Sequence, residues 1–287
     1  MATLRGGTFD KQATNAFYRL EALGTSKKSS ELQHQSHSVA TMEKRKGYLN
    51  DFKEYAKENF NREDGKLNDL MSKDNLKDFL RERLEGVSSN TAESYVSGFN
   101  SMMKGLAEHN ITICEGGINS MSEIRAEIKE NYRESEIQNR YVQDSEHIKA
   151  DLSHSSSIVA TLQHEAGFRA SEALEIARNP EKYLRDDNNA YNVAGKGGQH
   201  YQPKELSSDL AARLRDNTQE IPTYKQYQQE LKEYSINSHD FRFTYARNEY
   251  EKLTNEEGLT HKEALKSISE EMNHHRESTT EHYLART

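Results

Sequence analysis

Residues 239–242 of the chain read His-Asp-Phe-Arg, and residues 274–283 read His-His-Arg-Glu-Ser-Thr-Thr-Glu-His-Tyr. These two segments decide how the rest of the sequence is interpreted, because they gather imidazoles, a guanidinium and a phenol. A phosphodiester that reacts without a metal needs fixed cations around the phosphorus and a nucleophile with a removable proton. The two segments supply both, so the sequence predicts chemistry on a phosphodiester.

Arg169 and Lys196 lie in two further segments that suit the same chemistry. Arg169 stands in Gly-Phe-Arg-Ala-Ser-Glu-Ala-Leu, residues 167–174, at the end of an apolar segment. Its planar fork fits two phosphate oxygens, although an arginine beside a glutamate is usually a surface ion pair worth under about 1 kcal/mol. Lys196 stands in Gly-Lys-Gly-Gly between two short segments that predict a β-hairpin. A lysine at such a tip is usually solvated, but it can also protonate a departing 5′ oxygen.

His239 and Arg242 are three residues apart, so a helix places them on one face, with Ser238 as a plausible N-cap. A helix N-terminus is a natural anion site, while the plainer interpretation is a cap followed by a partly exposed histidine and arginine. His275 and His282 raise the alternative of a metal site. Since no His-x-x-x-His pair or accompanying cysteine is present here, phosphate chemistry is favoured over zinc.

In their order along the chain, these residues resemble the catalytic signature of the tyrosine recombinases, the integrase family that includes the Xer, Cre and phage lambda enzymes. The local contexts are similar to the family's boxes: the first arginine at 167–174, the lysine hairpin at 195–198, the central box at 239–242, and the spacing from His274 to Tyr283. The resemblance covers roughly residues 39–287 and is most specific in the catalytic half. Residues 272–274 depart from it, since Met-Asn-His replaces the more usual Leu-Gly-His.

The resemblance implies a catalytic set of Arg169, Lys196, His239, Arg242, His274 and Tyr283. By similarity, Tyr283 attacks a DNA phosphodiester, which gives a 3′-phosphotyrosyl link and a free 5′-hydroxyl without a metal or another cofactor. Arg169 and Arg242 clamp the non-bridging oxygens, and His274 donates a further hydrogen bond. A free tyrosine has a pKa of about 10, so a base is needed, and His239 is the candidate. Lys196 is the implied general acid.

Composition predicts a very soluble, largely helical protein. The 287 residues are 33% hydrophobic and 30% charged, with a mean hydropathy of -1.04. No run approaches the roughly 18 apolar residues of a membrane span, and the N-terminus lacks the apolar core of a signal peptide. Cys114 is the sole cysteine, so we expect a reducing compartment, the cytoplasm, and the resemblance implies association with the nucleoid. The net charge of -8 is unusual for a DNA-binding protein, but a basic groove can coexist with an acidic outer surface.

The predicted fold is mainly α, with a helical core-binding bundle and a mostly helical catalytic domain that carries a small β-hairpin, closing as a C-shaped clamp on DNA. Residues 1–38 read as an N-terminal extension and linker, with a short helix at roughly 10–23. Residues 39–112 resemble the family's helical (SAM-like) core-binding domain, with helices at about 74–84 and 91–108. Residues 113–287 form the predicted catalytic domain, because the Glu-Gly-Gly sequence at 115–117 marks a boundary.

The partners implied by the resemblance are double-stranded DNA with paired recombination sites, other copies of the chain in a homotetramer, and accessory DNA-bending proteins. Because four residues follow Tyr283, we expect any tetramer to be linked through residues 1–38 or through the Tyr283 helix. Three alternatives stay open: a type IB topoisomerase-like enzyme, a non-catalytic DNA-binding or regulatory protein on the same fold, and a helical scaffold. The sequence does not distinguish integration from excision, inversion or dimer resolution.

Overall fold

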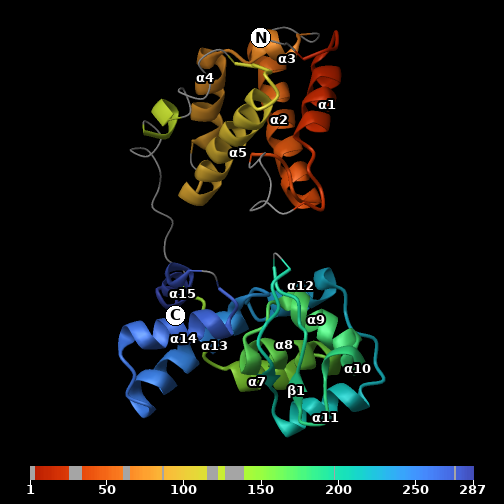
Figure 1. Cartoon of the computed structure of the whole chain (residues 1–287), viewed down its shortest axis with the longest axis vertical. Coiled ribbons are helices and arrows are strands. Elements are labelled where there is room, and N and C mark those ends of the chain that lie inside the picture. The colour runs from red at the N-terminus through yellow and green to blue at the C-terminus, as the bar shows by residue number, and fades with distance from the viewer. Residues whose placement is uncertain are drawn as a thin grey trace. The chain divides into compact units, whose positions relative to one another are not determined.

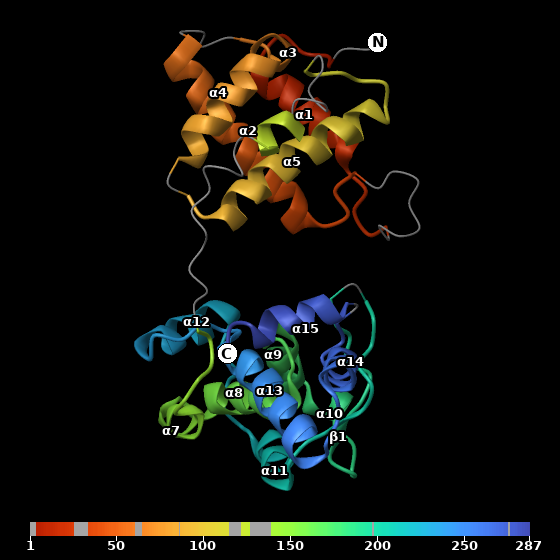
Figure 2. The same ribbon diagram turned by 90° about the vertical axis from the view of Figure 1, so that its left-hand side faces the viewer.

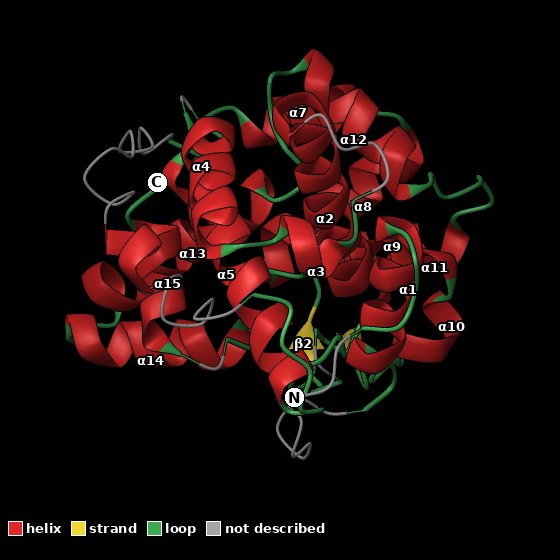
Figure 3. Cartoon of the chain, turned by 90° about the horizontal axis from the view of Figure 1, so that it is seen from above, coloured by secondary structure: helices red, strands yellow, loops and turns green. Residues whose placement is uncertain are grey.

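A computed structural model of the chain describes residues 4–25, 34–60, 65–85, 87–114, 122–126, 139–196, 198–274 and 276–287. The chain divides into two compact units, Met1–Glu136 and Ile137–Thr287, which run from red to yellow and from green to blue in Figure 1. Within the described ranges, helices dominate and one two-stranded antiparallel sheet accompanies them (Figure 3). The predicted fold class, mainly α with a small hairpin, is confirmed.

The first unit is a helical bundle of α1 (Phe9–Leu20), α2 (Val39–Phe60), α3 (Leu67–Leu70), α4 (Lys73–Leu84) and α5 (Ser89–Ala107). Helix α5 packs against α1, α2 and α4 (Figure 2). Its Phe99 meets Phe52 and Phe79 in an aromatic core, with the Phe52 and Phe79 ring centroids 5.3 Å apart. Helix α1, which the sequence assigns to a separate N-terminal segment, buries Phe17 and Leu20 in the same core.

Side-chain caps fix where several of these helices begin. Thr8, Ser72 and Ser88 each accept a hydrogen bond from the amide three residues ahead, which stabilises a helix N-terminus by about 1 kcal/mol. The sequence therefore predicts the starts of α4 and α5 to within two residues. Residues 26–33 of the predicted linker lie outside the described residues. The structural division after residue 136 lies C-terminal to the expected boundary after residue 112.

The second unit is built around α8 (His154–Ala166), which contacts α7 (Ser145–Asp151), α9 (Ala170–Arg178), α11 (Ser208–Asp216) and α13 (Asp240–Glu251). Residues 155–163 of α8 are all buried, as expected of a helix surrounded by others. The remaining elements are α10 (Pro180–Tyr183), α12 (Tyr224–Glu233), the π-helical turn η1 (Lys252–Glu256), α14 (His261–Glu271) and α15 (Glu277–Leu284). No helix in the described ranges is both long enough and apolar enough to span a membrane.

The sheet of the second unit is a hairpin that carries Lys196 near its tip. Strands β1 (Asn189–Ala190) and β2 (Lys204–Glu205) are antiparallel, with Ala190 opposite Lys204. Closer to the tip, Ala194 pairs with His200, and the Gly195 amide donates to the Gln199 carbonyl at 2.7 Å. The regular strands thus lie further from the turn than the predicted segments 190–194 and 199–202.

Candidate active site

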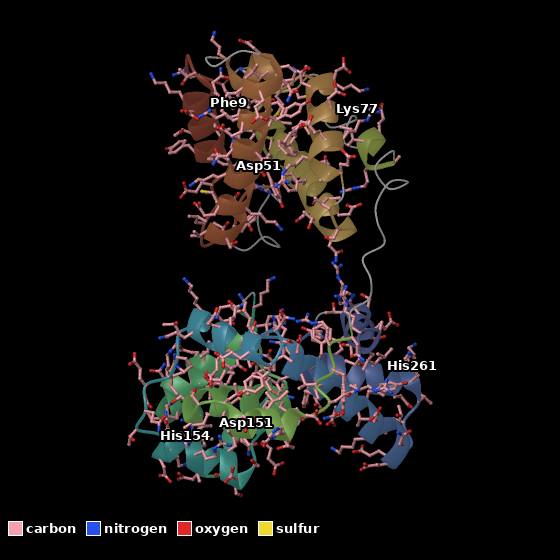
Figure 4. The ribbon with its side chains drawn as sticks, turned by 180° about the vertical axis from the view of Figure 1, so that it is seen from behind. Phe9, Asp51, Lys77, Asp151, His154 and His261 are labelled. Carbon is pink, nitrogen blue, oxygen red and sulfur yellow. The ribbon has the colours of Figure 1, made fainter. Side chains whose placement is uncertain are left out.

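The six residues predicted to act together lie in five segments of the second unit. These segments are the start of α9 (Arg169), the hairpin turn (Lys196), the start of α13 (His239 and Arg242), the loop after α14 (His274) and the last turn of α15 (Tyr283). Figure 4 labels His261, which begins α14, and His154, which begins α8. The predicted N-cap, Ser238, is one residue early: His239 occupies the N-cap of α13 and its side chain makes no capping bond.

Gly167 sets the path of the chain into Arg169. It ends α8 with a φ of 66°, the left-handed region that glycine adopts without strain. A Cβ atom at this position would lie 2.5 Å from the ring of Tyr245 in α13. Only glycine therefore allows α8 to turn into α9 this close to α13, and this turn places the Arg169 side chain beside Arg242.

Arg169 is held by a carboxylate and a phenol. Its amide donates to Glu172 Oε2 at 2.8 Å, and its Nη1 donates to Glu172 Oε1 at 2.9 Å. The same Nη1 donates to the Tyr201 hydroxyl at 3.0 Å, and that hydroxyl donates to Glu172 Oε2 at 2.7 Å. Glu172 is only 7% exposed, so this pair is a buried, hydrogen-bonded arrangement and not the usual surface ion pair.

Arg242 is completely buried, with 0% exposure. Its Nη1 donates to the Gly167 carbonyl and to the Tyr201 hydroxyl, the latter at 3.0 Å. Its Nη2 donates to the Met272 carbonyl at 2.6 Å and contacts His274 Nε2 at 3.1 Å. The guanidinium thereby joins the ends of α8 and α14 to α13, while its Nε has no hydrogen-bond partner in the described chain.

His274 is oriented from both ring nitrogens. A guanidinium can only donate, so Nε2 accepts from Arg242 and the proton of the neutral ring is assigned to Nδ1. Nδ1 then donates to the hydroxyl of Thr280 in α15 at 3.0 Å. The His274 amide donates to the Ser269 carbonyl at 2.8 Å, after Asn273 with a φ of 52°. The asparagine of the unusual Met-Asn-His sequence thus adopts the left-handed conformation that a glycine would adopt there.

Tyr283 lies next to His274 and Arg242. Its ring stacks on Phe243 at a centroid distance of 4.1 Å, and its centroid is 5.0 Å from that of His274. The Arg242 guanidinium carbon lies 5.9 Å from the ring centre. The Tyr283 side chain is half-buried, and its hydroxyl makes no hydrogen bond to the described part of the chain.

Arg140 supports Tyr283 from the start of the second unit. Its guanidinium lies 4.3 Å from the centre of the Phe243 ring, the ring on which Tyr283 stacks. Its Nε donates to the buried carboxylate of Asp240 at 2.7 Å, and its amide donates to the Arg286 carbonyl at 2.6 Å. The segment that enters the second unit is therefore attached to both α13 and the end of α15.

His239 is held in its neutral form. Burial, followed by the positive charges of Arg242, Arg140 and Arg169, lowers the pKa of His239 to about 4. Its Nδ1 is buried without a hydrogen-bond partner in the described residues. A neutral imidazole among these arginines can accept a proton, although His239 makes no hydrogen bond to Tyr283 in the described structure.

Lys196 is the predicted residue that the structure does not bring into the cluster. Its side chain is exposed and has no hydrogen bond or ion pair with the described residues. The hairpin that carries it is nevertheless anchored at the site, since Asn273 Nδ2 donates to the Gln199 carbonyl at 3.0 Å. Tyr201, on the segment that returns from the turn, provides the second attachment through Arg169 and Arg242.

A trio of Lys204, Tyr245 and Glu271 next to Arg242 was not anticipated from the sequence. Lys204 Nζ donates to the Tyr245 hydroxyl at 3.3 Å and lies 3.4 Å from Glu271 Oε2, to which Tyr245 also donates. Burial lowers the pKa of Lys204. These residues join β2, α13 and α14, the elements next to Lys196, Arg242 and His274. No short-range pattern reveals such a trio, because its members are far apart in the sequence.

A pocket of about 400 Å³ opens beside His274. Its lining combines cations with carboxylates: Lys266, Ser269, Glu270, His274, Arg276 and Glu277. The pocket places open space next to His274, which a substrate group could enter.

Comparison with known structures shows that the fold is similar to that of a site-specific recombinase. The chain is similar in structure to the XerH site-specific recombinase bound to difH substrate in a pre-cleavage complex, with a TM-score of 0.57 and 13% sequence identity over 98% of this chain and 94% of that chain. No protein-family model matches the sequence, and no curated protein is similar to it. At this identity the likeness establishes the fold alone, and it agrees with the predicted recombinase fold.

Proposed function

We propose that this protein is a tyrosine-type site-specific DNA recombinase, or integrase, that cleaves and rejoins DNA strands through a 3′-phosphotyrosyl intermediate. The observation that carries the proposal is the convergence of Arg169, Arg242, His274 and Tyr283 from four segments of the second unit. The likeness to a recombinase fold supports it independently of these residues. Metal and cofactor have no part in the proposed reaction.

The two arginines would stabilise the charge that develops on the non-bridging oxygens. Arg242 is fully buried, so its charge acts in a medium of low dielectric constant, where it is worth more than in water. In the described chain only Nη1 and the main-chain amide of Arg169 donate hydrogen bonds, which leaves its Nη2 and Nε for a phosphate oxygen. His274, fixed by Thr280, would hold Arg242 Nη2 and so keep that guanidinium oriented for the same phosphate.

Tyr283 would be the nucleophile and His239 the base. The Tyr283 oxygen forms a bond to phosphorus while its proton passes to His239, which is neutral at neutral pH. A bound phosphate is an anion and opposes the arginine charges that lower the pKa of His239. Proton uptake by His239 therefore becomes easier when the substrate is in place.

Lys196 would be the general acid. As the P–O5′ bond breaks, the departing oxygen takes the electron pair and a proton from the lysine, which gives a 5′-hydroxyl and the 3′-phosphotyrosyl ester. Rejoining is the reverse reaction with a 5′-hydroxyl from another strand. In the described structure Lys196 is exposed and makes no hydrogen bond or ion pair, so its ammonium group can approach bound DNA.

The proposed partners are double-stranded DNA with paired recombination sites, further copies of this chain in a tetramer, and accessory DNA-bending proteins. The proposed location is the cytoplasm, at the nucleoid. Tyr283 lies in α15, and the main chain of Arg286 just after it is bonded to Arg140. Contacts between subunits near the end of α15 would therefore act directly on the nucleophile.

Covalent trapping tests the proposal. The full chain is incubated with nicked suicide duplexes drawn from the sequence that flanks its own gene, and products are separated on a denaturing gel. We expect a protein–DNA adduct with the wild type and none with Tyr283→Phe, which should bind the same DNA. An adduct formed by Tyr283→Phe, or none by the wild type on duplexes that it binds, would contradict the proposal.

The same preparations separate the alternatives. A type IB topoisomerase-like enzyme would relax supercoiled plasmids of any sequence without exchanging strands between two sites. A non-catalytic DNA-binding or regulatory protein would bind its duplex with no adduct. Strand exchange between paired sites is the outcome that the proposal predicts.

A further inference from the structure

The hydrogen-bond donors of Arg242 are nearly exhausted within the protein. A guanidinium has two hydrogens on each Nη and one on Nε. The Nη hydrogens of Arg242 go to Gly167, Tyr201, Met272 and His274. Its unpartnered Nε is buried. A phosphate oxygen can therefore reach an Nη of Arg242 only if one of these four acceptors gives way.

Two of the four acceptors are main-chain carbonyls and two are side chains. The carbonyls of Gly167 and Met272 belong to the ends of α8 and α14, so they cannot leave without moving a helix. The His274 side chain is held by the bond from its Nδ1 to the buried Thr280, and its main chain by the bond from its amide to the Ser269 carbonyl. Tyr201 lies on the returning segment of the hairpin, outside the regular helices. It is the acceptor that Arg242 shares with Arg169.

The Tyr201 oxygen bridges the two arginines. It accepts one hydrogen bond from Arg169 Nη1 and one from Arg242 Nη1, each at 3.0 Å. A single oxygen bridging two guanidinium groups is the arrangement expected of a non-bridging phosphate oxygen clamped by two arginines. Displacement of Tyr201 would free one donor on each arginine at the same time.

We propose that the Tyr201 phenol is a stand-in for a phosphate oxygen, which holds the two arginines in their clamping geometry in the DNA-free protein and is exchanged for an oxygen of the substrate phosphate. The inference rests on the proposed function for the identity of that phosphate. Tyr201 is thus a positioning residue. Its hydroxyl keeps both guanidinium groups hydrogen-bonded and in place until the substrate binds.

Charge favours the exchange. Burial raises the pKa of Tyr201 to about 12, so the phenol is neutral at neutral pH. The arginine charges attract an anionic phosphate oxygen by a Coulomb interaction that a neutral phenol does not provide. The released phenol can keep its bond to Glu172, whose Oε2 accepts from it at 2.7 Å. In the DNA-free protein the phenol therefore keeps donors of both arginines hydrogen-bonded. Because the phenol is neutral, phosphate can still displace it.

Affinity for inorganic phosphate tests the exchange without requiring DNA cleavage. Tyr201→Phe removes the competing oxygen and leaves a donor unpaired on each arginine, so phosphate should bind about tenfold more tightly than to the wild type. The matched control is Tyr191→Phe, which removes a phenol bonded to the Asp187 carboxylate at 2.7 Å on the same hairpin. We expect wild-type affinity for this control. Equal or weaker phosphate binding by a folded Tyr201→Phe protein would overturn the proposal, since a merely structural phenol predicts no gain.

A second measurement needs no variant. In a crystal of the wild type soaked in phosphate, we expect an oxygen of the ion between the Arg169 and Arg242 side chains, with the Tyr201 hydroxyl turned away from both. Phosphate bound at the arginines while the hydroxyl keeps its two bonds would overturn the proposal. Both readouts are independent of the covalent adduct with DNA, so failure of the exchange and failure of the proposed function are distinguishable.

Discussion

Mild acid should destabilise the second unit, because two of its histidines are held neutral. His164 in α8 accepts a hydrogen bond from Lys149 Nζ at 3.1 Å. Burial first, and then the charge of Lys149, lower the pKa of His164 to about 4. Burial and the neighbouring arginines lower the pKa of His239 to the same value of about 4. We expect His164 to account for about half of the loss in stability.

The size of the loss follows from linkage between protonation and folding. An unfolded histidine has a pKa of about 6.5, so between about pH 6.5 and about pH 4 the unfolded chain binds a proton that the folded unit excludes. The contribution to stability is complete above about pH 6.5 and is lost as the pH falls toward about 4. Between about pH 7.5 and about pH 5, the free energy of unfolding should fall by about 2 kcal/mol per histidine, or about 4 kcal/mol for both.

Hydrogen exchange of the full chain, read by mass spectrometry on peptides of α8 and α13, measures this loss in the second unit alone. His164→Gln should reduce the loss from about 4 to about 2 kcal/mol. The control is His147→Gln, because the His147 side chain is 77% exposed; it should keep the wild-type loss. The same loss in His164→Gln as in the wild type, or a stability that rises on acidification, would refute the reasoning.

Three further changes test other parts of the site. Thr280→Val removes the acceptor of the His274 Nδ1 proton. It should slow single-turnover DNA cleavage about tenfold, with DNA affinity unchanged within about twofold. Cleavage at the wild-type rate would contradict this orienting role of Thr280. Gly167→Ala puts a methyl carbon 2.5 Å from the Tyr245 ring and should lower the free energy of unfolding by more than about 2 kcal/mol in urea titrations, whereas a smaller loss would mean that the turn can adjust. Lys196→Met should slow cleavage of an ordinary phosphodiester at least about a hundredfold. The variant should cleave a substrate with sulfur in place of the scissile 5′ oxygen at the wild-type rate, since a thiolate leaves without a proton. Equal defects on both substrates would exclude the acid role.

The helices and the hairpin could be predicted because their signals are local. Ser72 and Ser88 cap α4 and α5, and the apolar residues of α5 repeat at helical spacing before they meet Phe52 and Phe79. The glycine-rich sequence at 195–198 likewise marks the turn of the hairpin. The place of α1 was not predictable in this way, because nothing in its own sequence shows that its apolar face packs against α5.

The candidate site was predicted as a set of residues, but the contacts that hold it were not. The boxes around Arg169 and Arg242 can be found in the sequence, whereas the phenol of Tyr201 between them depends on the path of the hairpin. Thr280 belongs to the same short segment as His274 and Tyr283, yet its hydroxyl meets the imidazole only because α15 folds back after α14. Roles in catalysis remain predictions for the whole set.

Lys196 illustrates the limit of motif reasoning most clearly. Its sequence context matches the lysine hairpin of the recombinases, but its side chain is exposed and makes no contact with the arginines in the described structure. A spacing pattern specifies which residues belong to a site, not the conformation in which they meet.

Mapping of the protein–DNA adduct tests the central claim most directly. The wild type is trapped on a suicide duplex, the DNA is trimmed with a nuclease, and tryptic peptides are sequenced by mass spectrometry. The account predicts a nucleotide joined through its 3′-phosphate to Tyr283, in the peptide of residues 277–286. An adduct on any other residue, or a 5′-phosphate linkage, would contradict it.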